Sequence, residues 1–131
     1  MYTKSLIVCF FAYFFSILFG YLSLAYFDLG HLWFDILLAH TVATVVIFIF
    51  SVIYKNSSLY DPFWSVIPLP IFIYLIIYPE VDESSKLRFL LIGIPVTYYV
   101  IRLTWNWLKT WPGLEKEDFR YINLYQTFGR F

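Results

Sequence analysis

Four long apolar runs, separated by short polar segments, dominate the pattern of the chain. They cover about residues 6–27, 36–54, 63–78 and 89–108. A helix needs roughly 20 apolar residues to cross the hydrocarbon core of a bilayer. The apolar positions are continuous within each run, whereas a membrane β-strand would alternate. We therefore predict an all-α fold, a polytopic membrane helix bundle of about four transmembrane helices.

The third run is the least regular of the four. It carries Pro68 and Pro70, so we expect it to be kinked or to start irregularly. Immediately before it, Asp61 and Pro62 have the pattern of a helix start. In that interpretation Asp61 accepts the free amides of the first turn and Pro62 takes the first helical position.

The segment after the fourth run is polar. Residues 111–113 turn the chain, and we predict a short cytoplasmic amphipathic helix after them, with Leu114, Tyr121 and Tyr125 on its membrane face. Its first turn is expected to hold the acidic residues Glu115, Glu117 and Asp118. Together with the four spans, this segment would make residues 1–131 a single membrane domain.

The composition agrees with a membrane protein. Hydrophobic residues make up 61% of the chain and charged residues only 14%, against about 25% charged in soluble domains. The formal net charge is zero, so no nucleic-acid partner is indicated. Cys9 is the one cysteine and cannot form an internal disulfide. The lipid bilayer is therefore the first partner that we expect.

The lysines and arginines are unevenly distributed between the two sides of the predicted bundle. The side opposite the amino terminus holds Lys86 and Arg88. The amino-terminal side holds Lys4, Lys55, Lys109, Lys116, Arg120 and Arg130. By the positive-inside rule we predict that both termini are cytoplasmic, in the plasma membrane of a prokaryote or the endoplasmic reticulum of a eukaryote.

Two polar, aromatic-rich stretches emerge on the same predicted face of the membrane. The first covers residues 56–65 and the second runs from 102 to 121. Polar groups held at a membrane mark places where something is bound or held, so one shared polar site is the first hypothesis. The alternatives are local: Asp61 as a helix cap, Trp64 as an interface aromatic, and 117–121 as a solvated, self-paired helix start.

Arg102 is the deepest charge of the fourth span. Tyr98, Arg102 and Asn106 share one helix face, and we expect this stripe to face the bundle interior. Arg102 would then pair with Asp61, Glu117 or Asp118, unless it snorkels to the interface. No metal site is predicted, because His31 and Asp35 alone do not make one.

These segments resemble a known family. Residues 56–68, NSSLYDPFWSVIP, resemble a signature loop of the steroid 5-alpha-reductase-like integral membrane protein family. RLTWNW (102–107), WPGL (111–114) and EDFRY (117–121) are similar to its next signature, in the same order and at similar spacing. The resemblance covers the chain from about residue 34 onward.

The resemblance implies an NADPH-dependent enzyme that reduces the carbon–carbon double bond of a lipid or steroid enone from the cytoplasmic side. Arg102 and Arg120 would contact the cofactor phosphate or steady the carboxylates, while Trp64 and Tyr121 would line the entrance for a lipid-like substrate. The remaining residues of the site mouth would be Asn56, Asp61, Asn106 and Asp118. No catalytic residue is identified.

The resemblance reaches only the amino-terminal half of that family, whose members place most NADPH-binding positions in the other half. We therefore expect a fragment or truncated member that is inactive alone and does not bind NADPH tightly. It would act with a carboxy-terminal half or as a homo-oligomer. The alternative is a small non-enzymatic membrane protein or assembly partner.

Overall fold

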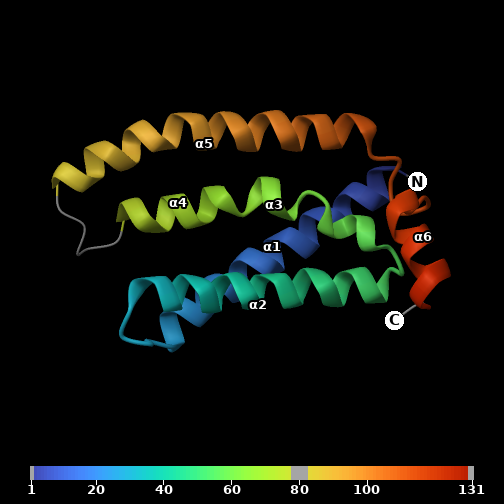
Figure 1. Ribbon diagram of the computed structural model, residues 1–131, viewed down its shortest axis with the longest axis horizontal. Coiled ribbons are helices and arrows are strands. Elements are labelled where there is room, and N and C mark those ends of the chain that lie inside the picture. The colour runs from blue at the N-terminus through green and yellow to red at the C-terminus, as the bar shows by residue number, and fades with distance from the viewer. Residues whose placement is uncertain (1, 78–82, 130–131) are drawn as a thin grey trace. The chain divides into compact units, whose positions relative to one another are not determined.

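The computed structural model describes residues 2–77 and 83–129. Across these residues it contains helices and no strand, which confirms the all-α prediction. In chain order the elements are α1 (Tyr2–Tyr26), α2 (Leu32–Ile53), the 3₁₀ turn η1 (Ser57–Tyr60), α3 (Phe63–Val66), α4 (Pro68–Ile77), α5 (Glu83–Thr110) and α6 (Phe119–Phe128) (Figure 1). Tyr78, the last residue of the third predicted span, lies outside the described residues.

Four described segments are long and apolar enough to cross a membrane: Tyr2–Tyr26, Leu32–Ile53, Ser57–Ile77 and Ser85–Thr110. They correspond to the four apolar runs, although each begins four to six residues earlier than predicted. The described chain divides into two compact units. Unit 1 consists of residues 1–61 and 112–131, and unit 2 of residues 62–111.

In unit 1, α1 and α2 pack against each other (Figure 1), and most of the α1 residues that are buried are small. The buried positions of α1 are one helical face: Ser5, Cys9, Ala12, Tyr13, Ser16, Gly20 and Ser23. A Cβ on Gly20 would lie 3.1 Å from the Ala39 carbonyl oxygen, and the Ser16 hydroxyl donates to the Ala43 carbonyl at 2.9 Å. Small side chains and interhelical hydrogen bonds hold membrane helices together because lipid provides no hydrophobic drive between them.

The end of α2 is a Schellman motif, which turns the chain sharply out of the helix. The Lys55 amide donates to the Val52 carbonyl at 3.2 Å, and the Asn56 amide donates to the Ser51 carbonyl at 3.0 Å. Lys55 takes the left-handed conformation that this motif requires, with φ 51°. The motif sends residues 56–61 directly away from the α2 axis.

In unit 2 the third span is broken, as its prolines predict. α3 ends at Val66, and α4 begins at Pro68, whose missing amide donor suits a helix start. The predicted cap was wrong, however. Pro62 is the N-cap of α3, with no side-chain cap hydrogen bond, because the Asp61 carboxylate is engaged by the carboxy-terminal segment of unit 1.

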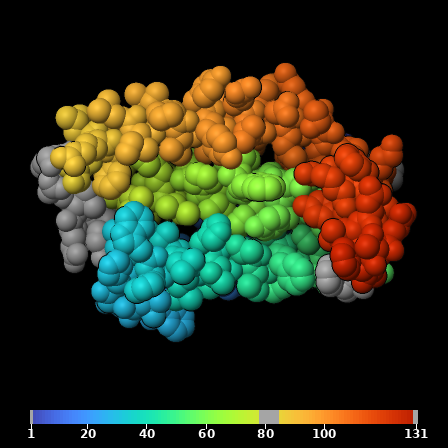
Figure 2. Space-filling view, in the orientation of Figure 1, coloured from blue at the N-terminus to red at the C-terminus, as the bar shows by residue number. Residues whose placement is uncertain are grey.

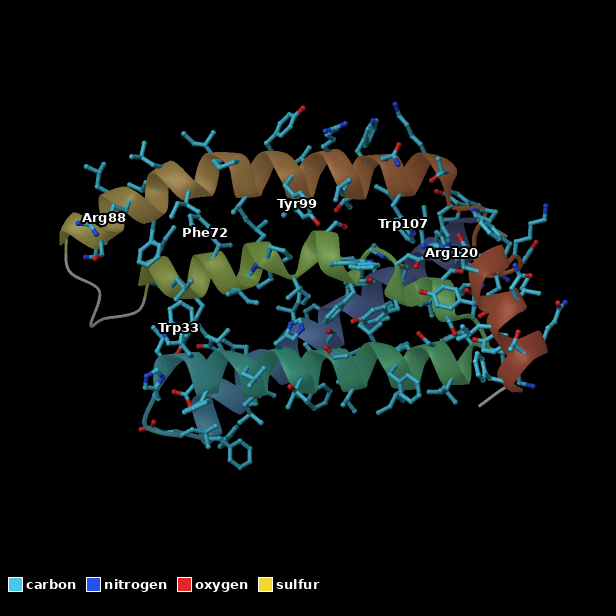
Figure 3. The ribbon with its side chains drawn as sticks, in the orientation of Figure 1. Trp33, Phe72, Arg88, Tyr99, Trp107 and Arg120 are labelled. Carbon is cyan, nitrogen blue, oxygen red and sulfur yellow. The ribbon has the colours of Figure 1, made fainter. Side chains whose placement is uncertain are left out.

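Helix α5 packs on α3 and α4 through one face, and this face excludes the polar stripe. Gly93 and Val100 are buried on it, and the ring of Phe72 lies where a Cβ on Gly93 would fall, with Phe72 Cζ at 2.5 Å. Figure 3 shows Phe72 and Tyr99 between α4 and α5. At about 100° per residue, Arg102 points to the opposite side of α5. Within unit 2 the stripe therefore lies on the side of α5 away from α3 and α4, and its expected place in the bundle interior stays a prediction.

Candidate functional site

Asn56 is the centre of the contact between the two polar segments of unit 1. Its side chain is 1% exposed. The amide nitrogen donates to the Leu114 carbonyl at 2.9 Å and to the Lys116 carbonyl at 3.3 Å. The amide oxygen accepts from the Ser58 amide at 2.9 Å and so caps η1. One buried side chain therefore fixes both the start of η1 and the course of the later segment.

Two serines extend this contact. The Ser57 amide donates to Glu117 Oε1 at 2.7 Å, and the Ser57 hydroxyl forms a short hydrogen bond with the Tyr125 hydroxyl. The Asp118 amide donates to the Ser58 hydroxyl at 2.8 Å. We call this set of contacts between residues 56–61 and 114–125 the clasp.

The polar end of the clasp is a group of four side chains. The Tyr121 hydroxyl donates to Asp61 Oδ1 at 2.9 Å. Arg120 Nη2 lies 3.5 Å from Asp61 Oδ1, while Arg120 Nε and Nη2 donate to the two Asp118 oxygens at 2.8 and 3.1 Å. Arg120 stands on α6, as Figure 3 shows, and its side chain is 57% exposed. It therefore joins two carboxylates from segments far apart in sequence.

These contacts set the charge states at the start of α6. The hydrogen bond from the Arg120 side chain holds the pKa of Asp118 below its usual range, and Asp118 in turn raises the pKa of Arg120. Burial, followed by the hydrogen bond to Asp61, raises the pKa of Tyr121. At neutral pH Asp118 and Arg120 are thus a charged pair, and Tyr121 is a neutral donor.

The clasp gathers five of the predicted site residues: Asn56, Asp61, Asp118, Arg120 and Tyr121. The other three belong to unit 2, where Trp64, Arg102 and Asn106 are exposed. The predicted pairing of Arg102 with an acid of these segments stays a prediction. Within unit 1, Arg120, only two residues from Asp118, pairs with Asp118 and with Asp61.

The membrane face predicted for the short helix was also wrong. Asp118 is the N-cap of α6, and its carboxylate accepts from the Arg120 amide at 2.9 Å. Tyr121 and Tyr125 share one face of α6, but their hydroxyl groups donate into the clasp. Phenol groups find a polar partner when they are partly buried, which explains why this face of α6 is turned toward the clasp. Figure 2 shows α6 at the molecular surface.

Sequence reasoning missed Ser57, Ser58 and Tyr125 as members of the clasp. A signal for Ser57 and Ser58 existed, because short hydroxyl side chains following an asparagine are typical of a capped turn. Nothing comparable marked Tyr125, since its hydroxyl finds its partners only in the folded chain.

The described residues hold no cluster of three or more metal-ligating side chains. His31 and Asp35 have structural roles instead. His31 is the N-cap of α2, and Asp35 accepts from the Leu29 amide at 2.8 Å. Both therefore serve the α1–α2 connection.

Comparison with known proteins identifies one family to which the chain is related. A family model described as a protein of unknown function, DUF1295, matches residues 47–131. No curated protein matches, and no solved structure matches. The matched region includes every residue of the clasp and all of unit 2. The chain belongs to the DUF1295 family.

Proposed function

We propose that this chain forms part of a membrane-embedded reductase similar to the steroid 5-alpha-reductases, which reduces a lipid or steroid enone with NADPH. The observation that carries the proposal is the clasp. It joins the two segments that carry the resemblance, 56–61 and 114–121, where the α2 span ends. A water-soluble cofactor and a lipid substrate can both reach such a boundary. NADPH, when bound, supplies a hydride to the enone β-carbon.

Arg120 is the residue of the clasp that suits a cofactor phosphate. Its Nε and Nη2 atoms engage carboxylates, and its exposed guanidinium leaves Nη1 for a phosphate oxygen. The carboxyl groups of Asp61 and Asp118 beside it, however, weaken the attraction for an anion. We therefore expect Arg120 to contribute to weak NADPH binding, and Arg102 of unit 2 is tested as a separate candidate.

Saturation-transfer NMR on the full chain in detergent tests this expectation, because the method detects weak ligands. We expect signals from the NADPH ribose that carries the 2′-phosphate, and weaker signals from NADH. Arg120→Gln and Arg102→Gln should each reduce the NADPH signals. Lys109→Gln, an exposed basic residue at the end of α5, is the control. NADPH signals that are absent, or unchanged by both arginine variants, contradict the cofactor proposal.

Turnover is the second measurement. Membranes that contain the chain are incubated with NADPH and an enone steroid. The reaction is measured as the loss of the ultraviolet absorbance of the enone. We expect no loss from the chain alone, because it is expected to be an inactive fragment. NADPH-dependent loss that the Arg120→Gln variant slows would overturn that expectation and support the reductase directly.

A second candidate function is a non-enzymatic membrane protein or assembly partner. The observation in its favour is that the clasp satisfies its own polar groups, from Asn56 at one end to Asp61 at the other. Such a network stabilises a fold without any ligand. Absent NADPH signals combined with strong destabilisation by clasp variants would favour this function.

A further inference from the structure

A pocket of about 470 Å³ opens in unit 1 beside the clasp. Its lining comes from the residues that follow α2, from the segment before α6, and from one face of α6. The residues that matter for its chemistry are Lys55, Leu114, Glu115, Glu117, Ile122 and Tyr125. This volume falls within the usual range for small-molecule sites.

The lining combines both charges with apolar surface. Lys55 and Glu115 are exposed and provide one positive and one negative group, while Leu114 and Ile122 are apolar. Lys55 lies two residues beyond the end of the α2 span at Ile53, so the pocket opens at the membrane boundary. A ligand that matches it has an ammonium, an anionic group and an apolar part, and is available in the bilayer.

The Schellman motif holds Lys55 in a left-handed backbone conformation beside the pocket. Lys55 has φ 51° at the Schellman position where glycine is favoured and a side chain is strained. Strained backbone conformations persist where the surrounding structure holds them, and they gather at binding sites. Lys55 combines such a strained backbone conformation with a position in the lining of a pocket.

We propose that this pocket binds the headgroup of a phosphatidylethanolamine lipid. The ammonium meets the carboxylates of Glu115 and Glu117, and the phosphate meets Lys55. The glycerol end lies against Leu114 and Ile122. A primary ammonium has three hydrogen-bond donors for these carboxylates, whereas a choline headgroup has none and favours a cage of several aromatic rings. Tyr125 is the one aromatic residue of the described lining.

Native mass spectrometry of the delipidated full chain in detergent tests the proposal. Phosphatidylethanolamine, phosphatidylcholine and phosphatidylglycerol are titrated separately, and we expect phosphatidylethanolamine to bind about tenfold more tightly than the other two. Lys55→Gly and Glu115→Gln should each weaken its binding about tenfold. Lys116→Gln changes an exposed neighbour outside the lining and should leave binding unchanged.

Lys55→Gly separates binding from folding, because glycine relieves the backbone strain. We expect an unchanged or higher unfolding temperature together with the loss of lipid. If the variant instead unfolds more easily, Lys55→Arg decides: retained binding supports the proposal and lost binding overturns it.

Three results overturn the proposal. One is equal binding of the three lipids, and another is full phosphatidylethanolamine binding by folded Lys55→Gly. The third is displacement of the lipid by an equal concentration of free phosphoethanolamine, which would identify a site for a soluble ligand. Neither NADPH nor an enone enters this test, so its result is independent of the proposed reductase activity.

Discussion

The Tyr121 hydroxyl donates a hydrogen bond of 2.9 Å to the carboxylate of Asp61, a residue 60 positions earlier in the chain. This bond ties α6 to the end of η1. It also draws the Asp61 side chain away from α3, which starts without a side-chain cap. The same carboxylate oxygen lies near Arg120, so a hydroxyl and a guanidinium share one acceptor.

Tyr121→Phe removes this hydrogen bond and keeps the ring. We expect it to lower the free energy of unfolding by about 1 kcal/mol, since Asp61 retains Arg120 as a partner. Thermal unfolding in detergent measures the change. Tyr26→Phe, at a residue 79% exposed, is the control and should have little effect. Equal effects of the two variants would show that the bond contributes nothing to stability.

Asn56→Ala should be the most damaging variant of the clasp. It removes the hydrogen-bond partner of the Leu114 and Lys116 carbonyls and of the Ser58 amide. We expect this loss to lower the free energy of unfolding by about 2 kcal/mol or more. Limited proteolysis between residues 111 and 118, together with unfolding temperature, measures the loss. Asn123→Ala, at an exposed position of α6, serves as the matched control. A protease-resistant Asn56→Ala protein would contradict the role given to this side chain.

The start of α6 should loosen at acid pH. The pKa of Asp118 is lowered by Arg120, so its contribution is complete above the ordinary aspartate pKa and is lost as pH falls through the lowered value. The Arg120 amide donates a hydrogen bond to the Asp118 carboxylate, so hydrogen exchange of this amide reports the change. Asp118→Asn keeps a capping oxygen and should remove the acid dependence. Identical pH profiles for the two proteins would be evidence against this account.

Gly93→Ala should disturb the packing of α4 on α5. The new methyl group would lie 2.5 Å from Phe72 Cζ and 2.6 Å from Phe72 Cε1, so the ring must move within a packed interface. We expect a loss of about 1–3 kcal/mol in detergent unfolding. The smaller side chain of Phe72→Leu should lessen the effect of Gly93→Ala in the double variant. If the two losses simply add, the ring and the glycine are not coupled.

The predicted topology is tested by reporter fusions. Fusions after Tyr54 and after Arg120 should both report the cytoplasmic side, and a fusion after Glu83 the other side. The expectation follows from the four spans and the distribution of lysine and arginine. A Glu83 fusion on the same side as the other two would rule out four spans.

The fold was largely predictable because apolar run length determines membrane spans almost by itself. The break before Pro68 was also predictable, because a proline removes one hydrogen-bond donor and limits one backbone dihedral angle. The interface between α1 and α2 was not predicted, although the spacing of Ser5, Cys9, Ala12, Ser16 and Gly20 on one helix face was visible in the sequence. Run length alone does not distinguish a face that packs from one that meets lipid.

The site was predictable only at the level of segments. Polar residues on the same side of a membrane are expected to meet, and 56–61 does meet 114–125. The individual partners were not predictable, because Asp118 can pair with any cation within reach. In the structure Arg120, two residues further along the chain, pairs with it. Tyr125 gave no local signal, since its partners are Ser57 and Glu117.

The long sequence separation within the clasp has a consequence for how the protein is made. The Ser57 amide finds its acceptor 60 residues later, and Asn56 finds the Leu114 carbonyl 58 residues later. When the first two spans leave the ribosome, the loop that follows them still lacks these partners. The nascent chain must therefore carry this loop in a hydrated, open state while the third and fourth spans enter the bilayer. Synthesis of residues 114–125 is the event that closes it.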